Sequence, residues 1–480
     1  MPFCKEITLN YLTMNSIKNF LTVCIFAAIG VGMTSCGDDN EIGSGDGTTP
    51  ITSNFAGAVY AMSNGSGQVD GNVQGDNWIA AYGRAADGTL SLIDRYGTGG
   101  LGGDFDGGEG LDPLISAYAL NKTEDNQFLL AVNAGSNTLT AFSIEENTFG
   151  LSITDTEGTN GIGPNSIAHT GALGPDGVNG LVYVSNINRE EFAGQGEPSQ
   201  QGSLMGYWLL DDGTLQPIDG AWRALANRPS AVQFSPNGDF LVVASINAGS
   251  ATLASDDQNE IVVYRVNENG TLSEDITAGA TSTLREDGTG RSNGRNLPSA
   301  IGFQIVGDNY VVVTEAREFQ PDGAPPAFPA LQDGSVSTWQ ITADGGLTPI
   351  SLDIASGVNN TGRTACWLDF TEDGNTFFVS NAIEAGLASY SFDNGVIQLL
   401  DQTAAQGVGA TGNTTDPAAA FGTTQGWIDM WISDDGEFLY QLHGLGGTIG
   451  VYSIDGTNLS LVEEVTGDLP ANNVQGIVAL

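Results

Sequence analysis

Short apolar runs alternate with turns containing Asp-Gly or Asn-Gly along most of the chain after residue 53, and the pattern repeats about every 50 to 75 residues. Seven segments each combine a strand of alternating apolar and polar residues, a Gly-containing turn and a short second strand. These segments begin at Trp78, Thr138, Leu204, Ile261, Ser335, Gly386 and Thr448. A more continuous apolar strand precedes each one, as in FLLAVNA and LVYVSN, and most units have a further strand before it.

Each repeating unit therefore contains four strands, which we name a to d in chain order. Helical periodicity is almost absent after the first 35 residues. Recurrence of one four-strand unit indicates an all-β, seven-bladed β-propeller, whereas a series of stacked sandwiches would not require the same unit to recur. We assign the propeller to residues 54–480.

The two ends of this propeller complement each other. The first unit lacks a strand a, and the residues from Asn473 to Leu480 (NVQGIVAL) follow the seventh unit as an unmatched strand. Placed innermost in blade 1, this strand would close the ring and remove two exposed sheet edges. The pattern thus predicts a ring closed by the C-terminal strand.

The first 35 residues have a different character. Lys18 precedes an apolar stretch from Phe20 to Met33, which is short for a membrane span and typical of a signal-peptide core. The stretch ends in Thr34-Ser35-Cys36, which resembles a bacterial lipoprotein cleavage site. The resemblance implies a signal peptide at 1–35, lipidation of Cys36, and a flexible acidic, Gly-rich tether at 36–53. A plain N-terminal membrane helix is the alternative, and Met14 is an alternative start.

The acidic residues directly after the lipidated cysteine resemble the surface-export signals of some Gram-negative lipoproteins. We therefore expect an exported protein of the cell envelope, held at the outer membrane and exposed at the surface. Its membrane contact would be the lipid anchor alone.

The charge balance limits the possible partners. The chain has 14 Lys and Arg against 57 Asp and Glu, a formal net charge of −43. So few cations cannot neutralise a run of phosphates, which excludes nucleic acids as partners. We expect a monomer with a solvated, salt-tolerant surface. With Cys36 lipidated, Cys366 is the one thiol of the propeller, so no disulfide is expected there.

Loop lengths locate the expected site. The a–b and c–d turns are tight, whereas the b–c and d–a connections contain the long insertions, such as residues 186–203, 316–334 and 403–426. Because the strands alternate in direction, the long connections all emerge on one face, which we call the elaborated face. Long loops on a rigid scaffold commonly contain binding and catalytic residues.

Arginines are concentrated at the expected position of this face. Arg228, Arg295 and Arg363 lie within a few residues of strand a in blades 4, 5 and 6, and Arg317 follows strand b of blade 5. Guanidinium groups around the channel mouth would bind a small carboxylate or phosphate. In the alternative interpretation, each arginine pairs with a local acid.

The chain has two histidines. His169 is predicted on strand a of blade 3, and His443 at the end of strand b of blade 7. A histidine beside arginine and glutamate could act as a general base, and a structural role is the alternative for each.

Other motifs add little. The run from Gly97 to Gly102 satisfies GxGxxG, but no helical pattern follows it, so a dinucleotide site is not expected. Four acids have side-chain oxygens that could coordinate Ca²⁺, but their spacing fits no standard calcium-binding loop. They are Asp104, Asp106, Glu109 and Asp112. We expect no cofactor.

The segments RPSAVQFSPNGDFLVV, ACWLDFTEDGNTFFVSN and IDMWISDDGEFLYQLHGLGG resemble the seven-bladed propeller lactonase family, which includes phosphogluconolactonase-like and carboxymuconate-cyclising members. The likeness covers nearly all of residues 55–480. Family members have a histidine near the start of one blade, where blade 4 here has Arg228-Pro229-Ser230. His169 occupies a comparable position one blade earlier.

The leading hypothesis is a lactonase-like hydrolase or cycloisomerase acting on a small anionic lactone or sugar acid. His169 or Glu315 would transfer the proton. The residues expected to bind the substrate and stabilise oxyanion charge are Arg228, Arg317, Arg363, Arg295 and His443. The alternative is a non-enzymatic surface lipoprotein whose propeller face binds a glycan or a protein. A quinone-dependent sugar oxidoreductase is disfavoured because basic residues and histidines are few.

Overall fold

The computed structural model describes most of the propeller. The described residues are 55–65, 68–69, 72–73, 75–104, 112–187, 202–225, 228–246, 260–273, 281–283, 299–307, 309–316, 334–357, 364–382, 384–406 and 426–480. The expected signal peptide, Cys36 and the tether lie outside them. Within these ranges the regular secondary structure consists of β-strands, so the described part of the chain contains no helix that could cross a membrane.

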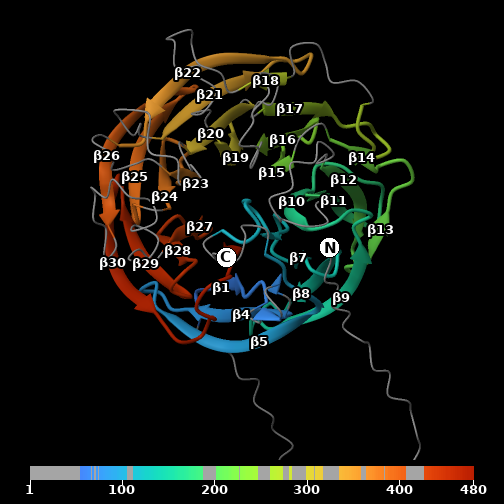
Figure 1. Cartoon of the computed structure of the whole chain (residues 1–480), viewed down its shortest axis with the longest axis horizontal. Helices are drawn as coiled ribbons and strands as arrows, with labels where there is room; N and C mark the ends of the chain where they lie inside the picture. The colour runs from blue at the N-terminus through green and yellow to red at the C-terminus, as the bar shows by residue number, and fades with distance from the viewer. Residues whose placement is uncertain are drawn as a thin grey trace, which may run out of the picture. The chain divides into compact units, whose positions relative to one another are not determined.

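Seven antiparallel sheets with four strand positions each follow one another around a ring, seen from one face in Figure 1. The predicted all-β, seven-bladed propeller is thereby confirmed. Blade 1 combines the two ends of the propeller. From the channel outward its strands are β31 (Ile477–Ala479), β1 (Gly57–Met62), β4 (Asp76–Arg84) and β5 (Leu90–Leu101).

The other blades each take consecutive strands from the channel to the rim. Blade 2 contains β6 (Leu120–Lys122), β7 (Phe128–Asn133), β8 (Thr138–Ile144) and β9 (Leu151–Gly158). Blade 3 contains β10 (Pro164–Thr170), β11 (Val178–Asn186), β12 (Ser203–Leu210) and the outer pieces β13 (Leu215–Pro217) and β14 (Arg223–Ala224). Blade 4 contains β15 (Arg228–Phe234), β16 (Phe240–Ile246), β17 (Glu260–Arg265) and β18 (Thr281–Thr283).

Blades 5 to 7 follow the same order. Blade 5 contains β19 (Ser299–Val306), β20 (Tyr310–Ala316), β21 (Ser335–Ile341) and β22 (Leu347–Ala355). Blade 6 contains β23 (Ala365–Phe370), β24 (Thr376–Asn381), β25 (Gly386–Asp393) and β26 (Val396–Gln406). Blade 7 contains β27 (Trp427–Ile432), β28 (Phe438–His443), β29 (Thr448–Asp455) and β30 (Asn458–Val465). A small hairpin, β2 (Gln68–Val69) with β3 (Asn72–Val73), lies outside the blades.

The C-terminal strand closes the ring as predicted. The buried strand β31 pairs antiparallel with β1. The N–H of Gly476 donates to Asp429 of blade 7 at 2.7 Å, and the N–H of Leu480 donates to the carbonyl of Ala58 in blade 1 at 2.8 Å. The closing strand therefore joins the last blade to the first.

The outer strands share an irregularity that the repeat pattern does not reveal. In five blades the pairing of strand c with strand d skips one residue of strand d at the equivalent position. The extra residues are Ile93, Thr154, Ile350, Leu400 and Val462. Such β-bulges bend an edge strand and hinder pairing with another chain, so they protect the rim of the propeller.

The aromatic residues of strand c pack between blades. Each is at most 5% exposed: Tyr82, Tyr207, Tyr264, Trp339, Tyr390 and Tyr452. Two of their hydroxyls reach the preceding blade. Tyr207 Oη donates to the carbonyl of Gly158 at 2.6 Å, and Tyr390 Oη donates to the carbonyl of Ala355 at 2.9 Å. Burial of a large ring and satisfaction of its polar end are thus combined at the same interface.

The residues from Asp112 to Ala119, which we call the channel segment, cross the interior of the ring before β6 begins. The Ser116 hydroxyl donates to the carbonyl of Asn165 in blade 3 at 2.7 Å. The indole Nε1–H of Trp367 in blade 6 donates to the Ser116 carbonyl at 3.0 Å. Blade 2 consequently has a short inner strand, because the chain that would extend β6 lies in the channel.

Tyr118 fills the channel further. Its hydroxyl donates to the carbonyl of Phe303 in blade 5 at 2.8 Å, and its ring meets Trp431 of blade 7 edge-on with centroids 6.5 Å apart. Its backbone has a φ of 65°, a region that non-glycine residues rarely adopt. A cavity of about 10 Å³ beside Tyr118 and Trp367 has the size of one water molecule. The channel is therefore packed with side chains at this level.

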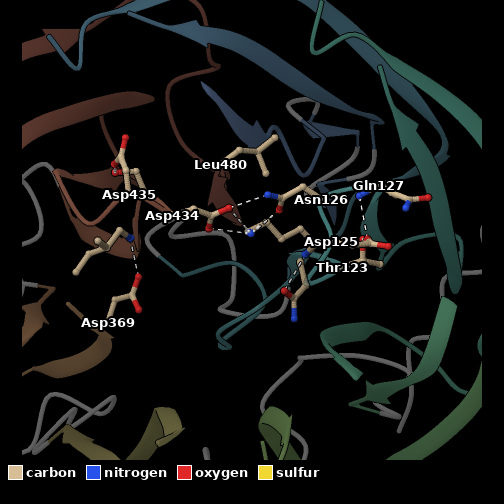
Figure 2. A network of polar contacts seen from close by, with 12 residues as sticks. Thr123, Asp125, Asn126, Gln127, Asp369, Asp434, Asp435 and Leu480 are labelled. Atoms are coloured by element: carbon tan, nitrogen blue, oxygen red, sulfur yellow. Dashed lines mark hydrogen bonds and ion pairs between the residues drawn. The ribbon is translucent and has the colours of Figure 1, made fainter. Parts of the chain in front are cut away.

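Two adjacent acids hold the junction of the ring on the face opposite the elaborated face. Asp435 Oδ2 lies 2.7 Å from Nη2 of Arg84, at the end of β4 in blade 1. Asp434 lies 2.9 Å from Nζ of Lys122 in blade 2, and Asn126 Nδ2 donates to it at 2.8 Å (Figure 2). One turn of blade 7 thus contacts both blade 1 and blade 2.

Candidate functional site

Three of the predicted site residues lie where inner strands meet the elaborated face. Arg228 is the first residue of β15, Glu315 is the next to last residue of β20, and His443 is the last residue of β28. Strand a starts from this face and strand b returns to it, so all three ends belong to the same face. Their side chains are buried, at 3% exposed for Arg228 and Glu315 and 2% for His443.

Arg228 and Glu315 stand on adjacent blades. Ser230, two residues after Arg228, donates its hydroxyl to the carbonyl of Ala300 at 2.5 Å. Ala300 in turn is the register partner of Glu315. Ser230 and Ala300 therefore link the strand ends that carry Arg228 and Glu315, and one face of adjacent blades provides both a guanidinium and a carboxylate.

Glu315 is fixed by its own blade and lies near the next one. The hydroxyl of Ser335, the first residue of β21, donates to Glu315 Oε2. Burial raises the pKa of Tyr390 in blade 6 well above its usual value, and the charge of Glu315 adds to the rise. The carboxylate thus lies within electrostatic reach of the interface between blades 5 and 6.

His443 has the contacts of a structural histidine. Its Nδ1 lies 2.8 Å from Thr448 Oγ1, whose hydroxyl donates to Glu464 Oε1 at 3.1 Å. Because that hydroxyl is the donor to Glu464, Nδ1 carries the proton toward Thr448. The imidazole stacks on Trp427 with centroids 5.0 Å apart. Burial lowers the pKa of His443 to about 3, so the ring is neutral at physiological pH.

His169 lies away from these residues. It is on strand a of blade 3 as predicted, but it is the next to last residue of β10, whose end leads to an a–b turn on the opposite face. It lies five positions after Pro164 along the strand, roughly 16 Å at the usual rise. Burial lowers its pKa to about 4, although the charge of Asp125 acts in the opposite direction.

Arg295, Arg317 and Arg363 lie outside the described residues, so their expected convergence stays a prediction. The described cations other than Arg228 mostly join blades. Arg223 donates to the carbonyl of Leu272 in blade 4 at 3.2 Å. Arg265 donates to the carbonyl of Ala343 in blade 5 at 2.8 Å. Comparable contacts between distant segments are made by Arg84, Arg95 and Lys122.

The four acids considered as Ca²⁺ ligands do not all lie in the described part of the chain. Asp106 and Glu109 lie outside the described residues. Asp112 belongs to the channel segment, where its Oδ1 accepts a hydrogen bond from Gln475 Nε2 at 2.7 Å. Within the described ranges no group of three or more His, Cys, Asp or Glu has a geometry that could hold a metal ion.

Two acids of the inner strands, the half-buried Asp369 and the buried Asp429, are absent from the predicted site. Burial raises the pKa of Asp369 in β23 to about 6, although Gln304 Nε2 donates to it at 2.7 Å. Burial also raises the pKa of Asp429 in β27 well above its usual value, and the nearby Asp112 adds to this. The sequence signal for both is a single acid within an apolar inner strand, LDF and IDM.

Comparison with solved structures shows proteins of similar fold. A crystal structure from Bacteroides uniformis described as a "putative 6-phosphogluconolactonase" aligns over 88% of this chain and 99% of its own, with a TM-score of 0.55 and 14% identity. One from Bacteroides fragilis with the same description aligns over 91% and 100%, with a TM-score of 0.53 and 14% identity. The periplasmic gluconolactonase of Pseudomonas aeruginosa aligns over 88% and 99%, with a TM-score of 0.57 and 14% identity.

The chain shares their seven-bladed fold. No protein-family model matches the sequence, and no curated protein matches it. At this identity the likeness establishes the architecture, and the activity must be argued from the residues.

The two histidines predict a pH dependence of stability. In the folded protein the pKa of each histidine is below the ordinary value of about 6.5. As the pH falls, the unfolded chain therefore binds more protons than the folded protein does. Their contribution is complete above pH 6.5 and decreases as the pH falls toward 4 for His169 and 3 for His443. We expect wild type to lose about 2 kcal/mol more than His443→Gln between pH 7 and pH 4.5. Urea unfolding of both proteins at the two pH values measures this difference. An equal loss of unfolding free energy in the two proteins would contradict the prediction.

Proposed function

We propose that the protein is a lactone hydrolase whose site lies on the elaborated face at blades 4 and 5. The observation that carries the proposal is the placement of Arg228 and Glu315 on adjacent blades, at strand ends on the same face, with both side chains 3% exposed. The likeness to propellers named as lactonases supports the reaction class at the level of the fold. The packed channel supports a site confined to one face, because Tyr118 and Trp431 fill the interior.

The proposed reaction needs one base and one anion-binding group. The carboxylate of Glu315, held by the Ser335 hydroxyl, would take a proton from a water molecule as the water oxygen attacks the lactone carbonyl. The guanidinium of Arg228 would bind the substrate carboxylate or the developing oxyanion. The ring C–O bond then breaks, and the proton held by Glu315 passes to the departing oxygen, which gives a hydroxy acid. Arg295, Arg317 and Arg363 are proposed to enlarge the anion site.

In this proposal neither His169 nor His443 has a role in proton transfer. The first lies toward the opposite face, and the second is held between Thr448 and Trp427. Both histidines have pKa values, about 4 and about 3, that leave them neutral and weakly basic. Cellular placement stays as expected from the sequence, namely a lipid-anchored, exported monomer.

The test compares turnover of anionic and neutral lactones. We expect Glu315→Gln to lower kcat/KM about 100-fold for both substrates, within the range typical of a lost general base. Arg228→Gln should raise KM for the anionic lactone at least 10-fold more than for the neutral one. His169→Gln, which alters the opposite face, is the matched control and should retain activity. Circular dichroism and thermal unfolding would verify that the variants are folded. Equal turnover by wild type and Glu315→Gln would refute the assignment.

The second candidate is a non-enzymatic binding protein, in which Arg228 and Glu315, both 3% exposed, have a structural role between blades. Absence of lactone turnover above the uncatalysed rate in a panel of anionic lactones, with the wild type folded, would support this candidate over the first.

A further inference from the structure

A groove of about 370 Å³ lies on the elaborated side of blades 1 and 2, away from Arg228 and Glu315. It is bordered by the end of β5, the start of β4 and the turn that follows β7. The lining residues are Asp76, Asn77, Gly97, Gly99, Gly100, Leu101 and Ser136. A volume of this size is typical of a site for a small organic ligand.

The glycines give the groove its open floor. A Cβ placed on Gly97 would meet no atom within 4 Å, and one on Gly99 would approach only Ile153 Cδ1, at 3.8 Å. A Cβ on Gly100, in contrast, would overlap the side chain of Asn133 at 2.4 Å. Gly100 is therefore required for packing, whereas Gly97 and Gly99 leave the backbone of an edge strand uncovered where a ligand could approach it.

The wall of the groove is rigid. Thr98 lies between the open glycines, and its hydroxyl donates to Asn133 Oδ1 at 2.6 Å. Asn77 Nδ2 donates to the same oxygen at 3.0 Å, and both asparagines are at most 1% exposed. The N–H of Leu101 donates to Ser136 Oγ at 3.0 Å. A buried polar network thus fixes the backbone that forms the floor.

The chemistry of the groove selects against anions. Asp76 is its one charged lining residue, and the described ion pairs do not include it. The guanidinium of Arg95 lies over the ring of Trp78 at 5.6 Å and donates to Asp468 at 3.1 Å, so it is held elsewhere. Ile153, 48% exposed, adds an apolar surface beside Gly99. A carboxylate acceptor, a hydroxyl and an exposed aliphatic side chain suit a neutral ring with several hydroxyls.

We propose that this groove binds a neutral saccharide. Sugar hydroxyls would donate to Asp76 and exchange hydrogen bonds with Ser136 and the uncovered backbone, while a C–H face of the ring packs on Ile153. The inference does not depend on the proposed lactone hydrolysis, because it uses other residues and a ligand of different charge.

The experiment screens the purified mature chain against neutral tetrasaccharides of glucose, mannose and xylose by saturation-transfer NMR, followed by calorimetry. Gly97→Leu places a side chain in the groove at a position where a Cβ would meet no atom within 4 Å, and it should weaken binding at least 10-fold. Gly158→Leu is the matched control, since Gly158 is also exposed near the end of a strand d and its Cβ would meet no atom within 4 Å. Asp76→Asn should weaken binding about 3- to 10-fold.

The outcomes separate this site from the proposed enzyme site. Binding that falls with Gly97→Leu but persists with Gly158→Leu and Glu315→Gln supports the groove. Failure of wild type to bind any neutral tetrasaccharide of the panel, or equal binding by wild type and Gly97→Leu, would overturn the proposal. Preference for a uronic-acid oligosaccharide over its neutral counterpart would also overturn it, whereas lactone turnover bears only on the other site.

Discussion

Deletion of residues 476–480 is expected to unfold the whole propeller instead of loosening one end. The strand removed has Ile477 at 2% exposed and Val478 at 0%, and burial of each such side chain contributes about 1.5–3 kcal/mol. With Leu480 at 8% exposed and the hydrogen bonds to blades 1 and 7, the loss should exceed about 5 kcal/mol. That equals a large part of the stability of an ordinary protein.

Hydrogen exchange resolved by peptide distinguishes global from local effects. In the deletion variant we expect lost protection in every blade, including blades 4 and 5, because an open ring exposes two sheet edges and interrupts the inter-blade packing. Leu461→Ser on the outer strand β30, where the side chain is 61% exposed, is the control and should change stability by less than about 0.5 kcal/mol. Protection retained in blades 3 to 6 after the deletion would show that the closing strand is only a local element.

The repeating architecture could be predicted from sequence because its signals are local. Turn residues and period-2 alternation specify strands within each unit, and seven recurrences specify the ring. Closure of the ring could be predicted from one missing and one surplus strand. Each of these inferences needs only residues within one unit or a count of units.

The channel segment could not be predicted in the same way. Its residues occur once and have no counterpart in the other units, so they match a long loop in the sequence. Their position depends on partners 185 and 251 residues away, as in the bonds from Tyr118 to Phe303 and from Trp367 to Ser116. Such contacts exist only once the ring has formed.

The candidate site shows the same limit. Sequence placed His443 correctly at the end of strand b, but it could not show that the ring would stack on Trp427 instead of facing the channel mouth. His169 was placed on the correct strand, but the pattern did not weigh its distance along that strand from the elaborated face. For the cations, residue spacing gave no indication that Arg84 would reach Asp435, 351 residues later in the chain.

Two neighbouring acids, Asp435 and Asp434, are expected to differ sharply in importance. Asp435→Asn should cost about 2–4 kcal/mol, because it leaves the guanidinium of Arg84, at 3% exposed, without its carboxylate at 2.7 Å. The amide retains an oxygen that can accept from the Ser433 hydroxyl, so the turn itself should persist. Asp434→Asn should cost less than about 1 kcal/mol, because Asp434 is 42% exposed and Asn126 still contacts Lys122 at 2.6 Å.

Salt and a double-mutant cycle separate the two cases. Sodium chloride at about 1 M should remove most of the small effect of Asp434→Asn, since exposed charges are screened, but little of the effect of Asp435→Asn. A cycle with Arg84→Met should give a coupling energy above about 1.5 kcal/mol for Arg84 and Asp435. Denaturant unfolding of the four proteins measures it. The prediction would be contradicted if Asp434→Asn and Asp435→Asn lost equal stability with equal salt dependence. Burial of Arg84 would then not make its ion pair with Asp435 stronger than the ion pair of Lys122 with Asp434.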